Sequence, residues 1–138
     1  MSSHGESHEL LQPPGWASPR GYANGVAASG RMVFIGGQIG WNASCELVAA
    51  DFVGQARQAL ANIVAILAEA GGRPEHIARM TWYVVDKREY LDSYRALGDA
   101  YRDTIGRHFP AMTAVEVSAL MEEGARVEIE ATAVIPAS

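Results

Sequence analysis

The chain has 138 residues, of which 49% are hydrophobic and 20% are charged, and its net charge is −5 at pH 7. This composition is typical of one globular domain and excludes a largely disordered chain. The basic residues are scattered, without the basic stripe that nucleic-acid binding requires. The apolar runs are far shorter than the roughly 20 residues of a membrane helix. We therefore expect neither a nucleic-acid partner nor a membrane.

The start of the chain predicts little structure. Residues 1–12 are polar without a clear period, and prolines and a glycine make residues 13–20 irregular. We predict a flexible N-terminal arm and lead-in over residues 1–20, followed by a single domain over residues 21–138. No secretory leader is visible, and the one cysteine, Cys45, cannot form an internal disulfide. A cytoplasmic location is therefore expected, because thiols stay reduced there.

Apolar patterning predicts seven elements in the domain. Two apolar runs flank Ser29-Gly30, which predicts two strands joined by a tight turn over residues 22–35. Helical spacing follows Asp51, a good N-cap, and stops at Gly71-Gly72, which predicts a helix over residues 51–70. Further along the chain, alternation of apolar and polar residues predicts strands over 77–85, 111–120 and 127–135, and helical spacing of apolar residues predicts a helix over 89–105.

The predicted order is β-β-α-β-α-β-β, which is an α+β fold with a mixed sheet. Two helices cover only one face of such a sheet, so its other face must meet water or another chain. Apolar residues remain for that open face, and we therefore expect an oligomer in which the open sheet faces meet.

Two acids on the last strand are the strongest catalytic candidates. Glu128 and Glu130 lie two residues apart on one face of an otherwise apolar strand. A carboxyl group in a partly dry site has a raised pKa and acts as a general acid near neutral pH. The alternative interpretation is that both carboxylates point to solvent or pair with arginines. Cys45 has no activating histidine close in sequence, so it is not a nucleophile candidate.

Several segments resemble the RidA/YjgF/YER057c family, also labelled endoribonuclease L-PSP or reactive intermediate deaminase. They are Gly-Tyr-Ala-Asn-Gly at 21–25, Val-Phe-Ile-Gly-Gly-Gln-Ile at 33–39, the segment 55–63, Phe-Pro-Ala at 109–111 with Val-Glu-Val at 115–117, and Val-Glu-Ile-Glu-Ala at 127–131. The resemblance covers nearly the whole chain after Gly21. It implies a chorismate-mutase-like fold and a homotrimer with ligands in three clefts between subunits.

The resemblance also implies an activity, which is the hydrolysis of a reactive enamine or imine metabolite to a carbonyl product and ammonia. No cofactor and no metal are implied. Glu128 then positions a water or relays a proton through it, and Tyr22, Gly37 and Ala111 belong to the substrate-binding site.

One position departs from the family pattern. Deaminase members have an arginine directly after the Pro-Ala pair, where it binds the substrate carboxylate, and this chain has Met112. Because a thioether donates no hydrogen bond, we expect a substrate other than the usual small 2-imino acids, held in a more apolar pocket with Met112 and Trp41. Arg20, two residues before Tyr22, is the candidate for a replacement anion anchor.

Two other functions stay open. One is a non-catalytic trimer of the same fold that binds a small molecule in the same cleft. The other is the ribonuclease activity named in the older family label. The excess of acidic over basic residues in the chain disfavours it.

Overall fold

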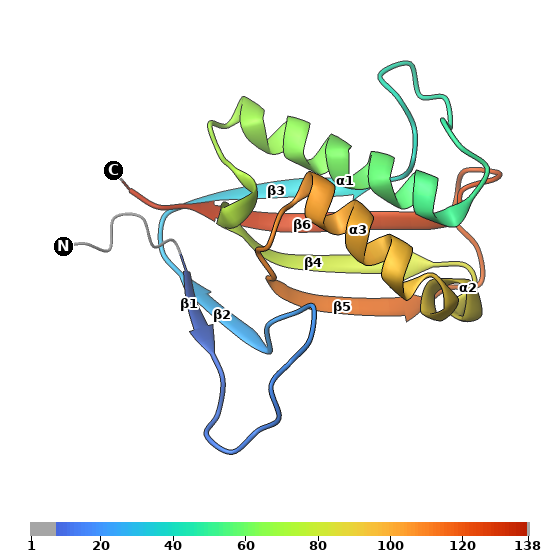
Figure 1. The fold of residues 1–138 in the computed structure, drawn as a ribbon. Coiled ribbons are helices and arrows are strands. Elements are labelled where there is room, and N and C mark those ends of the chain that lie inside the picture. Colours follow the sequence, from blue (N-terminus) through green and yellow to red (C-terminus); the bar gives the residue numbers. More distant parts are fainter. Residues whose placement is uncertain (1–7, 138) are drawn as a thin grey trace.

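The computed structural model describes residues 8–137. Three helices and a four-stranded sheet form the body of the molecule, and a two-stranded hairpin lies beside it (Figure 1). The strands are β1 (His8–Leu11), β2 (Gly25–Ala28), β3 (Arg31–Gln38), β4 (Ile77–Val84), β5 (Ala111–Glu116) and β6 (Val127–Ile135). The helices are α1 (Phe52–Glu69), α2 (Lys87–Asp92) and α3 (Tyr94–Thr104), with a 3-10 turn, η2, over Pro74–His76.

The main sheet has the strand order β3-β6-β4-β5, and α1 and α3 cover one of its faces (Figure 1). β4 and β5 are parallel, while the β3–β6 and β4–β6 pairs are antiparallel. Side chains alternate along β4, so Met80 and Trp82 are buried beneath the helices while Tyr83 lies on the other face. The predicted α+β fold with a mixed sheet and the helices on one face is confirmed.

Helix α1 forms where its sequence predicts it. The Asp51 carboxylate accepts a hydrogen bond from the Gly54 backbone N–H at 2.9 Å, which satisfies a free donor of the first turn. Gly71, with φ of +81°, follows the helix in the left-handed conformation that glycine adopts most easily. The face turned to the sheet is fully buried and consists of Ala56, Ala59, Leu60, Ile63 and Leu67. No helix among the described residues is long and apolar enough to cross a membrane.

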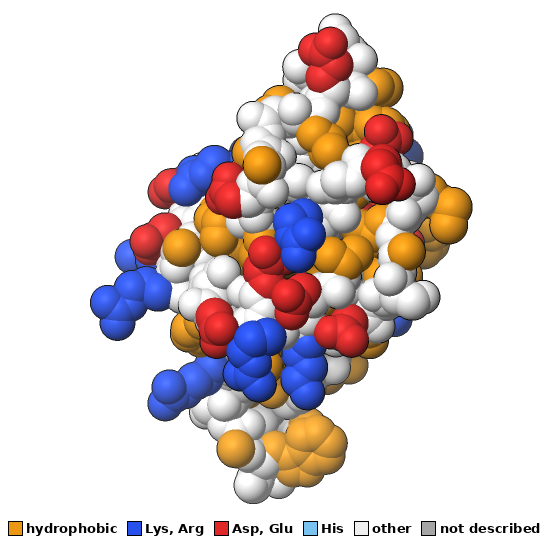
Figure 2. All heavy atoms as spheres, turned by 90° about the vertical axis from the view of Figure 1, so that its right-hand side faces the viewer, with side chains coloured by type: hydrophobic (Ala, Val, Ile, Leu, Met, Phe, Trp, Pro, Cys, Tyr) orange, Lys and Arg blue, Asp and Glu red, His pale blue; other side chains and the backbone are white. Residues whose placement is uncertain are grey.

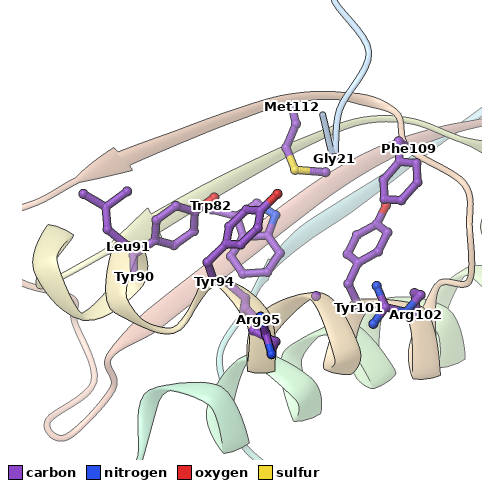
Figure 3. Close-up of a pocket in the computed structure, with 12 residues that line it drawn as sticks. Gly21, Trp82, Tyr90, Leu91, Tyr94, Arg95, Tyr101, Arg102, Phe109 and Met112 are labelled. Atoms are coloured by element: carbon purple, nitrogen blue, oxygen red, sulfur yellow. The ribbon is translucent and has the colours of Figure 1, made fainter. Parts of the chain in front are cut away.

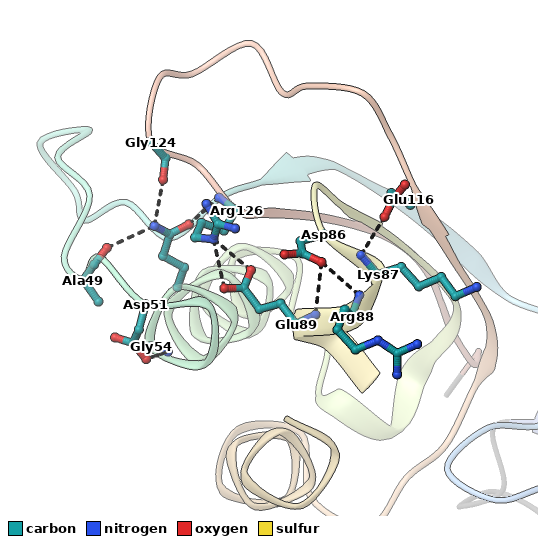
Figure 4. A network of polar contacts seen from close by, with 11 residues as sticks. Ala49, Asp51, Gly54, Asp86, Lys87, Arg88, Glu89, Glu116, Gly124 and Arg126 are labelled. Carbon is teal, nitrogen blue, oxygen red and sulfur yellow. Dashed lines mark hydrogen bonds and ion pairs between the residues drawn. The ribbon is translucent and has the colours of Figure 1, made fainter. Parts of the chain in front are cut away.

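A buried amide joins α1 to the segment before β6 (Figure 4). Gln55 has no exposed surface, and its Nε2 donates to the carbonyl oxygens of Ala49 and Gly124 at 3.1 and 3.0 Å. Its Oε1 accepts from the Arg126 backbone N–H at 2.7 Å. The Arg126 side chain in turn donates from Nε to the carboxylate of Glu89 on α2 at 2.8 Å. This network fixes α1, α2 and the start of β6 relative to one another.

The strand pairing differs from the sequence prediction. β2 pairs with β1, and β3 pairs with β6 instead of with β2. The expected hairpin over residues 22–35 is therefore wrong. The turn at Gly30 packs directly against the end of β6, where a Cβ would lie 2.1 Å from the Ile135 carbonyl oxygen. The chain thus crosses from the small hairpin to the main sheet at this glycine.

Three element boundaries also differ. The arm predicted over residues 1–12 is wrong for His8–Leu11, which forms β1, and residues 1–7 lie outside the described part. The helix predicted over residues 89–105 is two helices that meet at Ser93, and α2 begins earlier because Asp86 caps it through the backbone N–H groups of Arg88 and Glu89. β5 ends at Glu116 rather than at Leu120, opposite the last residue of its partner β4.

Candidate functional site

A cavity of about 410 Å³ lies on the helix side of the sheet, lined by α2, α3, β4 and the start of the edge strand β5 (Figure 3). Its walls are largely aromatic, from Trp82, Tyr90, Tyr94, Tyr101 and Phe109. Leu91, Leu97 and Met112 add apolar surface, and the remaining lining residues are Gly21, Arg95, Gly98 and Arg102. A largely apolar cavity of this size with a few polar groups is typical of a small-molecule site. We call it the helix-side cavity.

The aromatic walls are held in place by contacts with one another. Tyr101 and Phe109 stack with ring centroids 5.5 Å apart, and Trp82 meets Tyr90 edge to face at 6.1 Å. The Tyr101 hydroxyl donates to the His108 carbonyl oxygen at 2.6 Å, and burial raises the pKa of Tyr101 far above its usual range. Trp82 keeps its indole N–H buried without an acceptor in the part of the chain that the structure describes. These contacts preform the wall.

Met112 faces this cavity. It pairs with Met80 of β4, whose side chain is fully buried under the helices, so both side chains lie on the helix side of the sheet. The lead-in crosses the start of β5, because the Ala23 N–H donates to the Pro110 carbonyl oxygen at 3.0 Å and Ala23 bridges to Ala111. The structure therefore brings the lead-in, with Tyr22 next to Ala23, to the start of β5, but neither Tyr22 nor Ala111 lines the helix-side cavity with Met112.

Glu128 and Gly37 lie together, on the open face of the sheet. A Cβ on Gly37 would stand only 1.9 Å from Oε2 of Glu128, so the carboxylate occupies the space that a side chain on β3 would take. The pairing of β3 with β6 shifts register between Ile35 and Gln38, beside this contact. Within residues 8–137 the half-buried Glu128 makes no hydrogen bond and no ion pair. Its carboxylate therefore has no hydrogen-bond or ion-pair partner among the described residues.

The neighbouring acid has a structural partner. Glu130 accepts a hydrogen bond at 3.1 Å from the hydroxyl of Tyr83, which lies opposite Glu128 on β4. That bond raises the pKa of Tyr83, and burial and the charges of both glutamates act in the same direction. The two carboxylates, which share one face of the strand, therefore have different surroundings.

The sheet separates the two groups of predicted site residues. Met112 lies on the helix side and Glu128 on the open face, so the two do not form one site within a single chain. Trp41 and Arg20 belong to neither group and do not line the helix-side cavity. Trp41 instead bridges to Leu47 in the loop before α1, and its carbonyl oxygen accepts from Asn62 at 2.9 Å.

Three cavity residues on α3 were not found from the sequence. Arg95, Gly98 and Arg102 follow one another at spacings of three and four residues, which places them on one side of a helix. That spacing, with a glycine in the middle of a helical period, is the signal that points to them. Among the described residues no group of three or more His, Cys, Asp or Glu is placed to hold a metal ion.

Relatives of the chain are found by sequence. The family model described as Endoribonuclease L-PSP matches residues 16–135. The chain is 39% identical over 105 residues to a Capra hircus protein named 2-iminobutanoate/2-iminopropanoate deaminase, covering 75% of this chain and 73% of that protein. It is 36% identical over 113 residues to the Escherichia coli K12 protein of the same name, covering 82% and 86% of the two chains.

Solved structures agree. The Yersinia pestis protein YyfB, a Rid protein described as of unknown function, superposes with a TM-score of 0.83 at 31% identity, covering 94% of this chain and 99% of its own. The E. coli YjgF protein superposes with a TM-score of 0.65 at 35% identity, covering 82% and 87%. The sequence match over residues 16–135 and the shared fold show that this chain belongs to the endoribonuclease L-PSP family, the RidA/YjgF family.

Proposed function

We propose that the chain is a hydrolytic deaminase that converts a reactive imine, or its enamine tautomer, to a carbonyl compound and ammonia. Relatives that carry the name 2-iminobutanoate/2-iminopropanoate deaminase support this reaction class. The observation that carries the proposal is the Glu128 carboxylate, which lies over Gly37 and makes no hydrogen bond within residues 8–137. A half-buried carboxylate without an internal partner suits proton transfer to a bound molecule.

In the proposed reaction a water oxygen attacks the imine carbon. Glu128 accepts one proton from that water and passes it to the nitrogen, which gives a carbinolamine. The proton of the carbinolamine hydroxyl then moves to the nitrogen through the same carboxylate, and ammonia leaves as the carbonyl double bond forms. One water is consumed, and one carbonyl product and one ammonia are released. A positioned general acid–base of this kind contributes about 10²–10⁴-fold to the rate.

The cavity argues for a substrate larger than the small 2-imino acids. A charge-assisted hydrogen bond of the kind that an arginine makes is worth roughly 1.5–3 kcal/mol, and Met112 cannot supply it. Met112 lies instead among aromatic side chains in the helix-side cavity. Such walls favour a bulky apolar group over a methyl or ethyl group.

We further propose a homotrimer in which the reaction site lies between subunits. The open sheet face leaves Phe34 73% and Met32 56% exposed, and large exposed apolar side chains mark interaction surfaces. A site that uses both the helix-side cavity and Glu128 also needs two chains, since the sheet separates them in one. In this arrangement Glu128 of a neighbouring copy faces the mouth of the cavity.

Ribonuclease activity is the less supported alternative, although the family description names it. The chain has 16 acidic and 11 basic residues. On the face shown in Figure 2, acidic and basic side chains are interspersed rather than gathered into one basic surface. A surface of this kind gives little attraction for a phosphate backbone.

Ammonia release from imines generated in solution tests the deaminase proposal. An L-amino-acid oxidase supplies the 2-imino acids of alanine, leucine and phenylalanine, and the chain should accelerate ammonia release from the larger two more than from the first. The Met112→Arg variant should gain activity on the smallest imine, by about tenfold. Rates equal to the spontaneous rates for all three imines would refute the proposal, and product binding without acceleration would point to the non-catalytic trimer.

A further inference from the structure

We infer that α3 carries a replacement for the missing arginine. In this inference Arg95 and Arg102 bind the substrate carboxylate over Gly98, and the aromatic walls of the helix-side cavity hold an aromatic or bulky apolar side chain of the substrate. The substrate class is then a 2-imino acid with such a side chain. The reaction that this substrate undergoes rests on the proposed function, whereas the binding mode does not.

Gly98 is the first observation behind this inference. It lies in the interior of α3 and outside the left-handed region, so its backbone does not require glycine. A Cβ at this position would meet only Nη1 of Arg102, at the ordinary contact distance of 3.7 Å. Glycine weakens the interior of a helix relative to alanine, and here it relieves no clash within the chain. What it does is keep the cavity open above this turn of the helix.

The two arginines are the second observation. They lie seven residues apart, which is about two helical turns, and therefore flank Gly98 on the same side of α3. Arg95 makes no hydrogen bond and no ion pair in the part of the chain that the structure describes. Arg102 extends over Gly98 and pairs through Nη2 with Asp99, but both side chains are about half exposed, at 48% and 57%, so this pair is weak.

The charge of the cavity is the third observation. Arg95 and Arg102 are the charged residues of its lining, and no acidic residue among the described ones lines it. In Figure 3 both arginines project from α3, on the opposite side of the cavity from Met112. Guanidinium groups donate paired hydrogen bonds to a carboxylate. A ligand with its carboxylate toward α3 thus places its apolar part against Met112 and the aromatic rings.

Equilibrium binding of two 2-oxo acids tests the inference without depending on catalysis. Isothermal titration calorimetry should show phenylpyruvate binding at least about tenfold more tightly than pyruvate, because its ring fills the aromatic walls. Arg95→Met and Arg102→Met should each weaken phenylpyruvate binding by about tenfold. Arg88→Met is the matched control, since Arg88 is an exposed arginine of α2 outside the cavity lining, and it should bind as the wild type does.

Gly98→Leu separates binding from folding. Leucine fills the space above the helix and should abolish phenylpyruvate binding, while the thermal unfolding temperature stays the same or rises because leucine favours the helix. Unchanged binding in the two arginine variants and in Gly98→Leu would overturn the inference, as would equal affinity for the two acids. A wild type that binds phenylpyruvate through Arg95 yet releases no ammonia would refute only the proposed deaminase.

Discussion

At residue 37 the chain has no side chain, and the Glu128 carboxylate lies where one would be. An alanine there places its Cβ 1.9 Å from Oε2, so the flexible end of Glu128 must move away. We expect Gly37→Ala to lower kcat for imine hydrolysis by about 10²-fold, the range of a lost general acid–base. The unfolding temperature should change little, because a flexible side chain absorbs the shift.

The adjacent glycine provides the matched control. A Cβ on Gly36 meets nothing within 4 Å, so Gly36→Ala adds the same methyl group one residue away without touching Glu128. We expect its activity to stay close to that of the wild type. Equal losses in the two variants would show that the strand, and not the position of Glu128, accounts for the effect.

Gln55 carries a prediction about stability. Its amide is fully buried and satisfies three backbone groups, those of Ala49, Gly124 and Arg126. Gln55→Leu leaves these groups unpaired, and we expect it to lower the free energy of unfolding by about 2–4 kcal/mol. Gln58→Leu, on the same helix, removes one local contact with Asn62 and should cost about 1 kcal/mol or less. Urea unfolding of both variants checks this, and equal costs would contradict it.

At the scale of elements, local signals were enough for some parts of the fold. The sequence predicts α1 correctly because the helical period lies within the element and its start and stop signals, Asp51 and Gly71, directly flank it. β1 was missed because its four residues show no apolar alternation and its partner β2 lies more than ten residues away along the chain. The change of partner at Gly30 depends on the distant Ile135 and carries no local signal.

Some residues of the candidate site are likewise predictable from local sequence, and others are not. Resemblance of short motifs indicates Gly37 and Glu128, and the structure brings them into contact. The resemblance does not indicate Arg95 or Arg102, which reach the cavity because the folded chain places α3 across it from Met112 of β5. The motifs also do not show that Met112 and Glu128 lie on opposite faces of the sheet. This depends on which residues of β4 pair with β5 and with β6.

The hairpin strand β1 brings a pH-sensitive contact. His8 packs near His108, with ring centroids 6.1 Å apart, and both of its ring nitrogens are buried without a partner within residues 8–137. Burial lowers the pKa of His8, and the nearby His108 and His76 lower it further. The unfolded chain, with a histidine pKa near 6.5, therefore binds this proton more readily than the folded chain does.

The contribution of neutral His8 to the free energy of unfolding is therefore fully present above about pH 6.5. It is lost as the pH falls below this value toward the lowered pKa of His8 in the folded chain. We expect the unfolding temperature to be lower at about pH 5.5 than at about pH 7.5, with a smaller drop in His8→Gln. Calorimetry at the two pH values measures this difference. A drop of the same size in His8→Gln would exclude His8 as its source.

For the whole molecule, the proposed trimer depends on the open face of the sheet. Phe34 is 73% exposed on this face, which no helix among residues 8–137 covers (Figure 1). We expect light scattering to give a mass about three times the 14.8 kDa of the chain. Phe34→Lys should break this assembly and reduce imine hydrolysis with it, since a charge at a buried interface is costly.

Met121→Lys is the control for this prediction. Met121 is 98% exposed in the turn before β6, and a lysine there should leave the mass unchanged. A wild-type chain that is monomeric at working concentration would contradict the proposed trimer, and so would a Phe34→Lys variant that keeps the trimer mass.

The most direct test of the whole account compares two carboxylates on one strand. Glu128 and Glu130 share a face of β6, but only Glu130 accepts the Tyr83 hydroxyl. Ammonia release from the 2-imino acid of phenylalanine should fall by about 10²-fold or more in Glu128→Gln and change little in Glu130→Gln. Unchanged turnover in Glu128→Gln, or an equal loss in both variants, would contradict the role of Glu128.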